Sequence, residues 1–270
     1  CTFIQRDAWP TGCRTVPWCW DMTPGGGSKA QSERGVTGFE IGDRVALEPG
    51  VPCGHCEDCL KGHYNLCRSV RFMAIPGEKD GVFSEYCTHA ASMTFKLPDN
   101  VSTMEGGLME PLAVGMHACE LSNAKLGETA VVLGAGCIGL VTLMSLKARG
   151  VSEIYVADVL DKRLEKAREL GATRVFNSRN ENIEEFVKTL PGGGVDQVYE
   201  CAGNRITTLQ TSRLIKRAGK ITLVGVSPEP VLELDISHAE CHGGNHLLCI
   251  PLPQPVSVRY QCCQQGTYTA

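Results

Sequence analysis

The sequence predicts an α/β fold in which a doubly wound parallel sheet follows a smaller β-rich domain. A β-branched run at residues 130–133 leads into a Gly-x-Gly-x-x-Gly turn, and an apolar helix pattern follows the turn. Strand-like and helix-like segments then alternate to about residue 225, which is typical of a parallel sheet with helices on both faces. Before the turn, short strand patterns surround a loop with four closely spaced cysteines.

Length and composition are typical of a globular protein without a nucleic-acid partner. The chain has 270 residues, enough for two modest domains, with 43% hydrophobic and 21% charged residues. The net charge is −4, and lysine and arginine do not cluster. No secretory signal opens the sequence, and because residue 1 is cysteine rather than methionine we expect a fragment. With cysteines in metal-like spacing, these features predict a reducing, cytoplasmic location.

The first third of the chain predicts few regular elements. Residues 1–35 have no sustained period of two or 3.6, so we expect a poorly ordered tail there. Residues 39–47 predict a turn that leads into a strand, and short strands are expected at 81–87 and 92–97.

Residues 103–120 predict a helix that breaks at Pro111. Glu110 lies directly before this proline in a mostly apolar neighbourhood. From the spacing alone, a capping or surface role and a functional role are equally expected for Glu110.

Cys53, Cys56, Cys59 and Cys67 have the spacing C-x2-C-x2-C-x7-C on a loop that contains glycine. Four thiolates at this spacing can surround one tetrahedral Zn²⁺, and a closed shell of four thiolates is structural rather than catalytic. An iron–sulfur cluster also takes four thiolates, although its usual spacings differ, and disulfides are a further alternative. Two histidines in the same loop are alternative ligands, but we expect them to be loop residues beside a complete site.

Gly134, Gly136 and Gly139 form the Gly-x-Gly-x-x-Gly motif. In a Rossmann fold the first glycine makes a tight turn, the second lets the backbone approach a pyrophosphate, and the third lets helix pack on strand. A strand pattern ends on Asp158, nineteen residues after Gly139, where the dinucleotide fingerprint has an acid that binds a ribose 2′-hydroxyl. The sequence therefore predicts nucleotide binding.

Two alternatives to nucleotide binding concern the same stretch. One is a glycine turn in another kind of α/β protein. The other is a membrane span, because residues 129–146 carry no charge; however, three glycines interrupt this run, and eighteen residues is near the lower limit for spanning. We expect no membrane association.

Helix and strand patterns alternate after the glycine motif. The expected helices are residues 137–146, 161–170, 181–190 and 206–217, and the expected strands are residues 153–158, 174–176, 196–200 and 220–225.

Ligands of such a sheet bind at the carboxyl ends of its strands. Asp158, the segment from Glu200 to Gly203 and the segment from Val224 to Val226 should therefore border one crevice. Cys201 is a possible nucleophile, but no base is placed for it, and we expect a small core residue. From about Ala239 the alternation stops, and we expect a loose or non-native tail.

The chain from Val36 to Ile236 resembles the zinc-containing medium-chain dehydrogenase/reductase family, and within it the sorbitol and xylitol dehydrogenases. The resemblance covers about three quarters of the sequence. Its motifs are Gly42 to Pro49, the four cysteines, Leu97 to Val101, Glu110 to Gly115 and Gly134 to Gly139.

The resemblance implies a GroES-like β-rich domain with a structural zinc lobe, followed by a Rossmann NAD-binding domain. The expected division is an aberrant segment at 1–35, the GroES-like domain at 36–112, the Rossmann domain at 113–238 and a second aberrant segment at 239–270.

Site residues also follow from the resemblance. The glutamate that matches Glu110 lies at the catalytic zinc of the family, as a direct ligand or through water. Asp158 favours NAD over NADP, because a carboxylate repels a 2′-phosphate. The implied cofactor contacts are Ile138, Asp158, Arg163, Val224, Gly225 and Val226.

The implied reaction is oxidation of a secondary alcohol of a small polyol to a ketone, with Zn²⁺ polarising the alcohol and NAD⁺ taking the hydride. A homo-oligomer is implied as well. Alternatives are a threonine- or alcohol-type dehydrogenase, a catalytically inactive zinc- and nucleotide-binding remnant, and, least favoured by the charge, a zinc-ribbon protein that binds nucleic acid.

The chain departs from the family at both ends. The catalytic zinc of the family needs a cysteine near the N-terminus and a Gly-His-Glu further on, and neither occurs in frame. Back-translation of Pro17 to Met22 in a shifted frame gives Val-Leu-Gly, then His or Tyr, then Asp, close to the family's Val-Leu-Gly-His-Glu. Cys249 to Gln254 permits a similar, weaker match. We therefore hypothesise that both ends are frameshifted and that activity is impaired, which nucleotide sequencing of the two ends tests.

Overall fold

The computed structural model describes residues 2–5, 30–32, 37–40, 42–75, 80–82, 86–228, 231–235, 246–249, 257–261 and 267–269. Side chains are described for residues 37–40, 42–75, 80–82 and 86–228. The chain divides into two compact units, Cys1–Glu110 and Pro111–Ala270, and each is described by itself. The four-part domain division stays a prediction.

The first unit consists of short antiparallel pairings and short helices. Strand β1 (Thr2–Gln5) lies between β2 (Ala30–Ser32) and β6 (Tyr86–His89). Its other strand pairs are β3 (Val45–Leu47) with β7 (Thr94–Lys96), and β4 (Gly50–Val51) with β5 (Arg71–Phe72). Its helices are α1 (Glu57–Leu60), η1 (Tyr64–Leu66), η2 (Ala91–Met93) and α2 (Thr103–Gly107).

A small core holds this unit together. Val45, Leu47, Met73 and Val82 are buried against one another. The Arg44 guanidinium donates to the carbonyl oxygens of Val101, Pro98 (3.0 Å) and Asp99 (3.2 Å), and it thereby fastens the turn after β7 to the start of β3.

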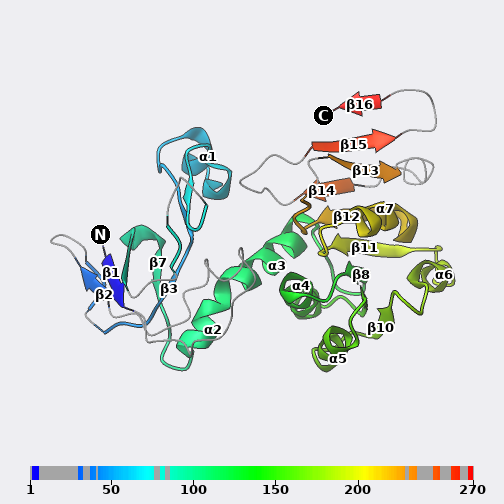
Figure 1. Ribbon diagram of the computed structural model, residues 1–270, viewed down its shortest axis with the longest axis horizontal. Helices are drawn as coiled ribbons and strands as arrows, with labels where there is room; N and C mark the ends of the chain where they lie inside the picture. Colours follow the sequence, from blue (N-terminus) through cyan, green and yellow to red (C-terminus); the bar gives the residue numbers. More distant parts are fainter. Residues whose placement is uncertain are drawn as a thin grey trace. The chain divides into compact units, whose positions relative to one another are not determined.

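The second unit is a six-stranded parallel sheet with helices on both faces (Figure 1). Its strand order is β10 (Arg174–Asn177), β9 (Glu153–Asp158), β8 (Thr129–Leu133), β11 (Val195–Glu200), β12 (Ile215–Leu223) and β14 (His246–Cys249). Since the chain order of these strands is 3-2-1-4-5-6, the direction of winding reverses between β8 and β11. This order is that of the predicted Rossmann fold.

Two apolar layers enclose the sheet. Val132 and Val156 face one layer with Leu143 of α4, whereas Val131 and Val198 face the other. All five side chains are fully or almost fully buried, and each contributes about 1.5–3 kcal/mol by leaving water. The helices are α4 (Cys137–Ala148), α5 (Asp161–Glu169), α6 (Ile183–Lys188) and α7 (Arg205–Leu214).

The uncharged run at residues 129–146 is not one element. It divides into β8 and the twelve-residue helix α4. Among the described residues, no helix has both the length and the apolar character needed to cross a membrane.

The helix predicted at 103–120 is interrupted, but not at Pro111. The interruption is at Leu108, between α2 and α3 (Met109–Leu121). A continuous helix would require the Pro111 nitrogen to donate to the Gly107 carbonyl, which proline cannot do. As the third residue of α3, Pro111 lies in the first turn, where backbone N–H groups have no intrahelical partner.

Helix α2 begins with a capping box. The Ser102 hydroxyl accepts the Glu105 N–H at 3.2 Å, and the Glu105 carboxylate accepts the Ser102 N–H at 2.8 Å. We expect Ser102→Ala to lower the free energy of unfolding of the first unit by about 1 kcal/mol. Chemical denaturation measures this, and Ser92→Ala, at an exposed position, should stay within about 0.5 kcal/mol of the parent. Equal effects of the two changes would contradict the role of the cap.

The helix predicted at 206–217 is shorter than expected. Helix α7 ends at Leu214, and Ile215 already adopts an extended conformation (φ −86°, ψ 138°) at the start of β12. The Ile215 side chain is buried, and a Cβ on Gly219 would lie 2.6 Å from it. Burial of this β-branched residue against the second apolar layer therefore favours the strand, although the residues that follow prefer a helix.

The strand expected at 81–87 is also different. Gly81 and Val82 are not in a strand, β6 begins at Tyr86, and residues 83–85 lie outside the described residues. The strand expected at 92–97 is shortened to β7, because the preceding residues form η2 and the Thr94 hydroxyl donates back to the Ala90 carbonyl at 2.9 Å.

Regular elements also occur where none was expected. Strands β1 and β2 lie within residues 1–35, and β14, β15 (Ser257–Gln261) and β16 (Thr267–Thr269) lie beyond residue 239. Strand β14 extends the parallel sheet beside β12, whereas β13 (Val231–Asp235), β15 and β16 form a separate sheet. A four-residue segment such as β14 is too short for its periodicity to distinguish a strand from a loop. These strands do not test the frameshift hypothesis.

Candidate metal centre and dinucleotide crevice

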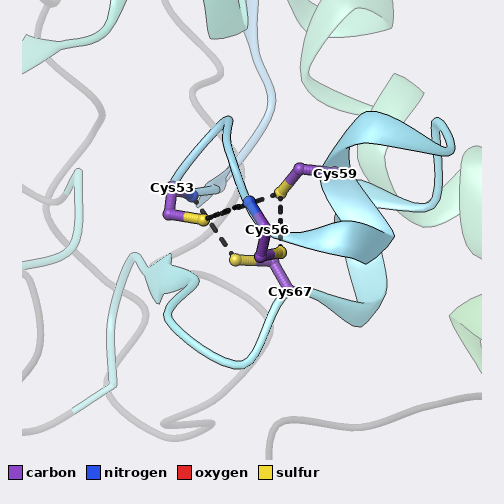
Figure 2. Close-up of side chains that lie close together, drawn as sticks. All are labelled: Cys53, Cys56, Cys59 and Cys67. Carbon is purple, nitrogen blue, oxygen red and sulfur yellow. Dashed lines mark hydrogen bonds between the residues drawn. The ribbon is translucent and has the colours of Figure 1, made fainter.

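The four cysteines converge on one point in the first unit. They lie on the loop between β4 and β5, which carries α1 and η1, and Figure 2 shows their sulfur atoms facing one another. The four Sγ atoms lie within 4.8 Å of one another, with 3.9 Å between Cys53 and Cys59 and 3.4 Å between Cys56 and Cys59. Gly54 makes the loop possible, because its φ of +79° is in the left-handed region.

These distances fit a single zinc ion. Four sulfur atoms placed tetrahedrally at the usual Zn–S distance of about 2.3 Å lie about 3.8 Å apart. The observed separations exceed a disulfide bond length of about 2.05 Å, and the small cage has no room for several iron atoms. His55 and His63 are exposed beside the cage, and a His55 ring nitrogen instead contacts the Cys53 carbonyl at 2.8 Å.

Charge within the cage also favours a cation. Backbone N–H groups of His55 and Cys56 lower the pKa of Cys53 to about 6. Burial and the neighbouring thiols raise the pKa of Cys59 to about 12. Cys59 therefore becomes a thiolate only when a positive ion compensates its charge, which is what Zn²⁺ does.

Glu110 lies in the first turn of α3, at the end of the first unit. Burial, followed by the nearby Glu48 carboxylate, raises the pKa of Glu110 to about 7. Burial also raises the pKa of Glu48, which accepts a hydrogen bond from Tyr64. Sequence reasoning missed this pairing of Glu48 with Glu110, although a carboxylate directly after an apolar strand is a recognisable signal.

A catalytic zinc ion does not fit the part of the chain whose side chains are described. There, the four cysteines form the only group of three or more candidate ligands, and Glu110 belongs to no second group. One carboxylate by itself does not hold a zinc ion.

In the second unit, the three glycines of the motif have different surroundings. A Cβ on Gly139 would lie 1.8 Å from the Gly134 carbonyl oxygen, so only glycine fits where α4 packs on the turn. Gly134 itself has a φ of +100°. A Cβ on Gly136 would meet nothing within 4 Å, and Gly136 is the N-cap of α4 without a side-chain cap. The open backbone at a helix N-terminus fits a pyrophosphate.

Asp158 lies at the carboxyl end of β9, beside this turn. Its side chain is only 5% exposed, and it accepts the backbone N–H groups of Ala135 at 2.7 Å and Leu160 at 2.9 Å. The Arg163 guanidinium is 3.6 Å away and half exposed. Each carboxylate oxygen can accept a further bond, so the fixed carboxylate fits a ribose hydroxyl.

The remaining predicted contacts lie on α4 or shortly after β12. Ile138 packs partly against the core, Val224 is buried, and Val226 is 64% exposed directly after β12. Cys201 packs against the core, with its thiol 3.8 Å from the Thr142 hydroxyl, and burial raises its pKa. A thiol with a raised pKa is a poor nucleophile.

Comparisons with known proteins match both units. The alcohol dehydrogenase GroES-like domain family matches residues 25–99, and the zinc-binding dehydrogenase family matches residues 137–243. A crystal structure of ECK1772, an oxidoreductase/dehydrogenase of unknown specificity from Escherichia coli, is 37% identical with a TM-score of 0.78 and covers 92% of this chain and 76% of its own. The chain belongs to the zinc-containing medium-chain dehydrogenase/reductase family.

Two curated members of this family show what share of a relative's length the chain covers. The uncharacterised zinc-type alcohol dehydrogenase-like protein YdjJ of Escherichia coli is 49% identical over 197 residues, 72% of this chain and 56% of its own length. Sorbitol dehydrogenase of Bacillus subtilis is 39% identical over 202 residues, 74% of this chain and 57% of its own length. The chain therefore spans little more than half the length of these relatives.

Proposed function

We propose that the chain binds NAD in the crevice of the second unit and one structural zinc ion in the first. The observation that carries the cofactor assignment is the fixed Asp158 carboxylate beside the open N-terminus of α4. The glycines and Asp158 would hold the pyrophosphate and the adenosine ribose, and Arg163, Ile138 and the segment from Val224 to Val226 would line the rest. When bound, NAD⁺ supplies a hydride acceptor.

We propose that the reaction at this crevice is the oxidation of a secondary alcohol of a small polyol to a ketone. Its support is the similarity to sorbitol dehydrogenase and the motifs shared with that group. By its match to the family motif, Glu110 is proposed to act at the catalytic zinc, directly or through water. Because the described residues offer it no companion ligands, we expect little or no turnover by this chain.

A substrate panel tests the reaction. Reduction of NAD⁺ is followed with sorbitol, xylitol, threonine and simple alcohols in turn. Turnover selective for polyols would support the assignment and would contradict the expected impairment. Turnover only with threonine or simple alcohols would replace the proposed substrate class. Binding of NADH and zinc without turnover on any substrate would favour the inactive remnant.

Cofactor choice is predicted to depend on Asp158. A carboxylate about 4 Å from a phosphate costs about 4 kcal/mol at an effective dielectric constant of about 20, and 1.4 kcal/mol corresponds to a tenfold change. We expect the parent chain to bind NADH at least tenfold more tightly than NADPH, and Asp158→Ala to reduce this ratio to within about threefold. Fluorescence titration of both cofactors measures it.

Asp161→Ala is the matched control, since it removes an exposed carboxylate three residues further on. It should leave the ratio of the two dissociation constants near that of the parent. Equal binding of NADH and NADPH by the parent chain would refute the role of Asp158.

A further inference from the structure

The sulfur atoms of the four-cysteine cage differ in the hydrogen bonds that they accept. The Cys53 sulfur accepts the backbone N–H of Cys56 at 3.4 Å and also that of His55. The Cys67 sulfur accepts the backbone N–H of Cys53 at 3.4 Å, and Figure 2 marks hydrogen bonds within the cage with dashed lines. In both cases the backbone of the loop itself supplies a donor to the sulfur.

Cys56 is the exception among the four. Cys59 accepts a hydrogen bond from the Gly54 backbone, so it too has a donor. Cys56 is the N-cap of α1, a position from which a side chain can accept first-turn N–H groups, but its side chain makes no such bond. Within the described part of the chain, the Cys56 sulfur instead contacts the Cys59 sulfur at 3.4 Å. In that part of the chain, no backbone N–H is bonded to the Cys56 sulfur.

Burial does not compensate for this difference. Cys67 is 4% exposed, whereas the other three cysteines are half-buried. Steric protection therefore separates Cys67 from the rest but does not single out Cys56. Two acidic residues, Glu57 and Asp58, directly follow Cys56. Because like charges repel, a neutral reagent approaches this part of the cage more easily than an anionic one.

Hydrogen bonds rank the sulfur atoms once zinc is bound. Every ligand is then a thiolate, so protonation no longer distinguishes the four. A backbone N–H draws electron density from a thiolate, and its bond weakens when the sulfur becomes a neutral thioether. A typical hydrogen bond corresponds to about a 2- to 10-fold factor in an equilibrium or rate constant. The Cys56 sulfur has no such bond to lose, so its lone pair is the most available for attack.

We propose that Cys56 is the residue at which soft, neutral electrophiles modify the zinc-loaded cage, and that its alkylation releases the metal. This inference rests on the proposed zinc site. With an α,β-unsaturated carbonyl compound, a sulfur lone pair forms a C–S bond to the β-carbon. The π electron pair moves to the α-carbon, which takes a proton from water and leaves hydroxide. Nothing is oxidised or reduced. The product is a thioether, a much weaker zinc ligand than a thiolate, and three thiolates remain.

The test is limited alkylation of the full, zinc-loaded chain with N-ethylmaleimide, a neutral α,β-unsaturated carbonyl reagent. Peptide mass spectrometry identifies the modified cysteine in residues 53–67 at low extents of labelling, and a chromogenic chelator follows zinc release. We expect Cys56 to carry more than half of the first adducts within this segment. Zinc should appear in step with the Cys56 adduct, because loss of one thiolate ligand weakens the site.

Controls separate the effect of the cage from that of the reagent. In denaturant with a chelator present, the four cysteines should label within about threefold of one another, because only nearby sequence then affects each thiol. Cys137→Ser removes an exposed thiol on α4 and should leave both the labelling pattern within the cage and zinc release unchanged. A change in this variant would mean that modification elsewhere opens the cage, which would overturn the inference.

The outcomes distinguish this inference from the proposed zinc site. First attack at Cys56 together with zinc release supports the inference. Preferential or equal labelling of another cage cysteine, or a Cys56 adduct that keeps its zinc, would overturn the inference and leave the zinc site intact. A parent chain that binds no zinc would overturn both.

Discussion

Cys67→Ser is expected to abolish zinc binding by the first unit. Cys67 is the buried member of the cage, and its sulfur also accepts the Cys53 N–H at 3.4 Å. Mutation of a residue that only hydrogen-bonds a metal ligand typically lowers metal affinity by about 10- to 100-fold. Loss of a thiolate ligand itself should therefore lower zinc affinity by more than about 100-fold. Metal analysis after dialysis should find about one zinc ion per parent chain and less than a tenth of that in the variant.

The consequences of this loss should be local. The loop between β4 and β5 contains only short helices, which are marginal without the metal. We expect protease cleavage within residues 53–67 in the variant and in the chelator-treated parent, with the parallel sheet unaffected. Cys137→Ser, on α4 of the second unit, is the control, and this variant should bind as much zinc as the parent chain.

Two outcomes would contradict this account of the zinc. A parent chain without zinc would show that the cage is not a metal site. Two zinc ions per chain would show that Glu110 does find companion ligands, and a catalytic site would then have to be reconsidered.

Gly139→Ala is expected to damage both the fold and the cofactor site. The added Cβ would lie 1.8 Å from the Gly134 carbonyl oxygen and 2.8 Å from its carbon, so backbone rather than a flexible side chain must move. Overpacking of this kind costs about 1–3 kcal/mol or more. We expect the free energy of unfolding to fall by about 3 kcal/mol, and NADH affinity to fall because the backbone at the proposed pyrophosphate position must move.

Gly136→Ala is the matched control in the same motif. Its Cβ meets nothing within 4 Å, and its φ of −72° suits alanine, so stability should be unchanged. NADH affinity should nevertheless fall, because the proposed pyrophosphate approaches this backbone. Chemical denaturation and fluorescence titration of both variants separate the two effects. Unchanged NADH binding in Gly136→Ala would contradict the position assigned to the pyrophosphate.

Local patterns predicted most of the second unit. Strands β8 and β9 are short, mostly apolar runs between turn residues and are buried along almost their whole length, so their signal is strong. The glycine motif and Asp158 were predicted at their positions because the spacing itself reflects how a turn, a helix and the next strand connect. The cysteine spacing predicted the cage for the same reason, since all four ligands come from one loop.

Other features depended on residues distant in the sequence. The end of α7 was predicted too late because the burial of Ile215 against the second apolar layer is invisible to a local pattern. The helix interruption lies three residues before Pro111, where it was predicted. Its position depends on which carbonyl the proline leaves without a donor. Strand β14 became recognisable only from its pairing with β12.

The sequence by itself determined the family, the strand–turn–helix of the proposed cofactor site and the four-cysteine cage, because these depend on contacts within a few tens of residues. The tertiary structure decided which groups lie beside one another when they are farther apart in the sequence. It brought Glu48 near Glu110, and it buried the Glu200 carboxylate against Gly225, where its donors among the described residues are neutral. The physical reason is that burial and the charges around a buried group belong to a place in the fold, and no run of residues encodes them locally.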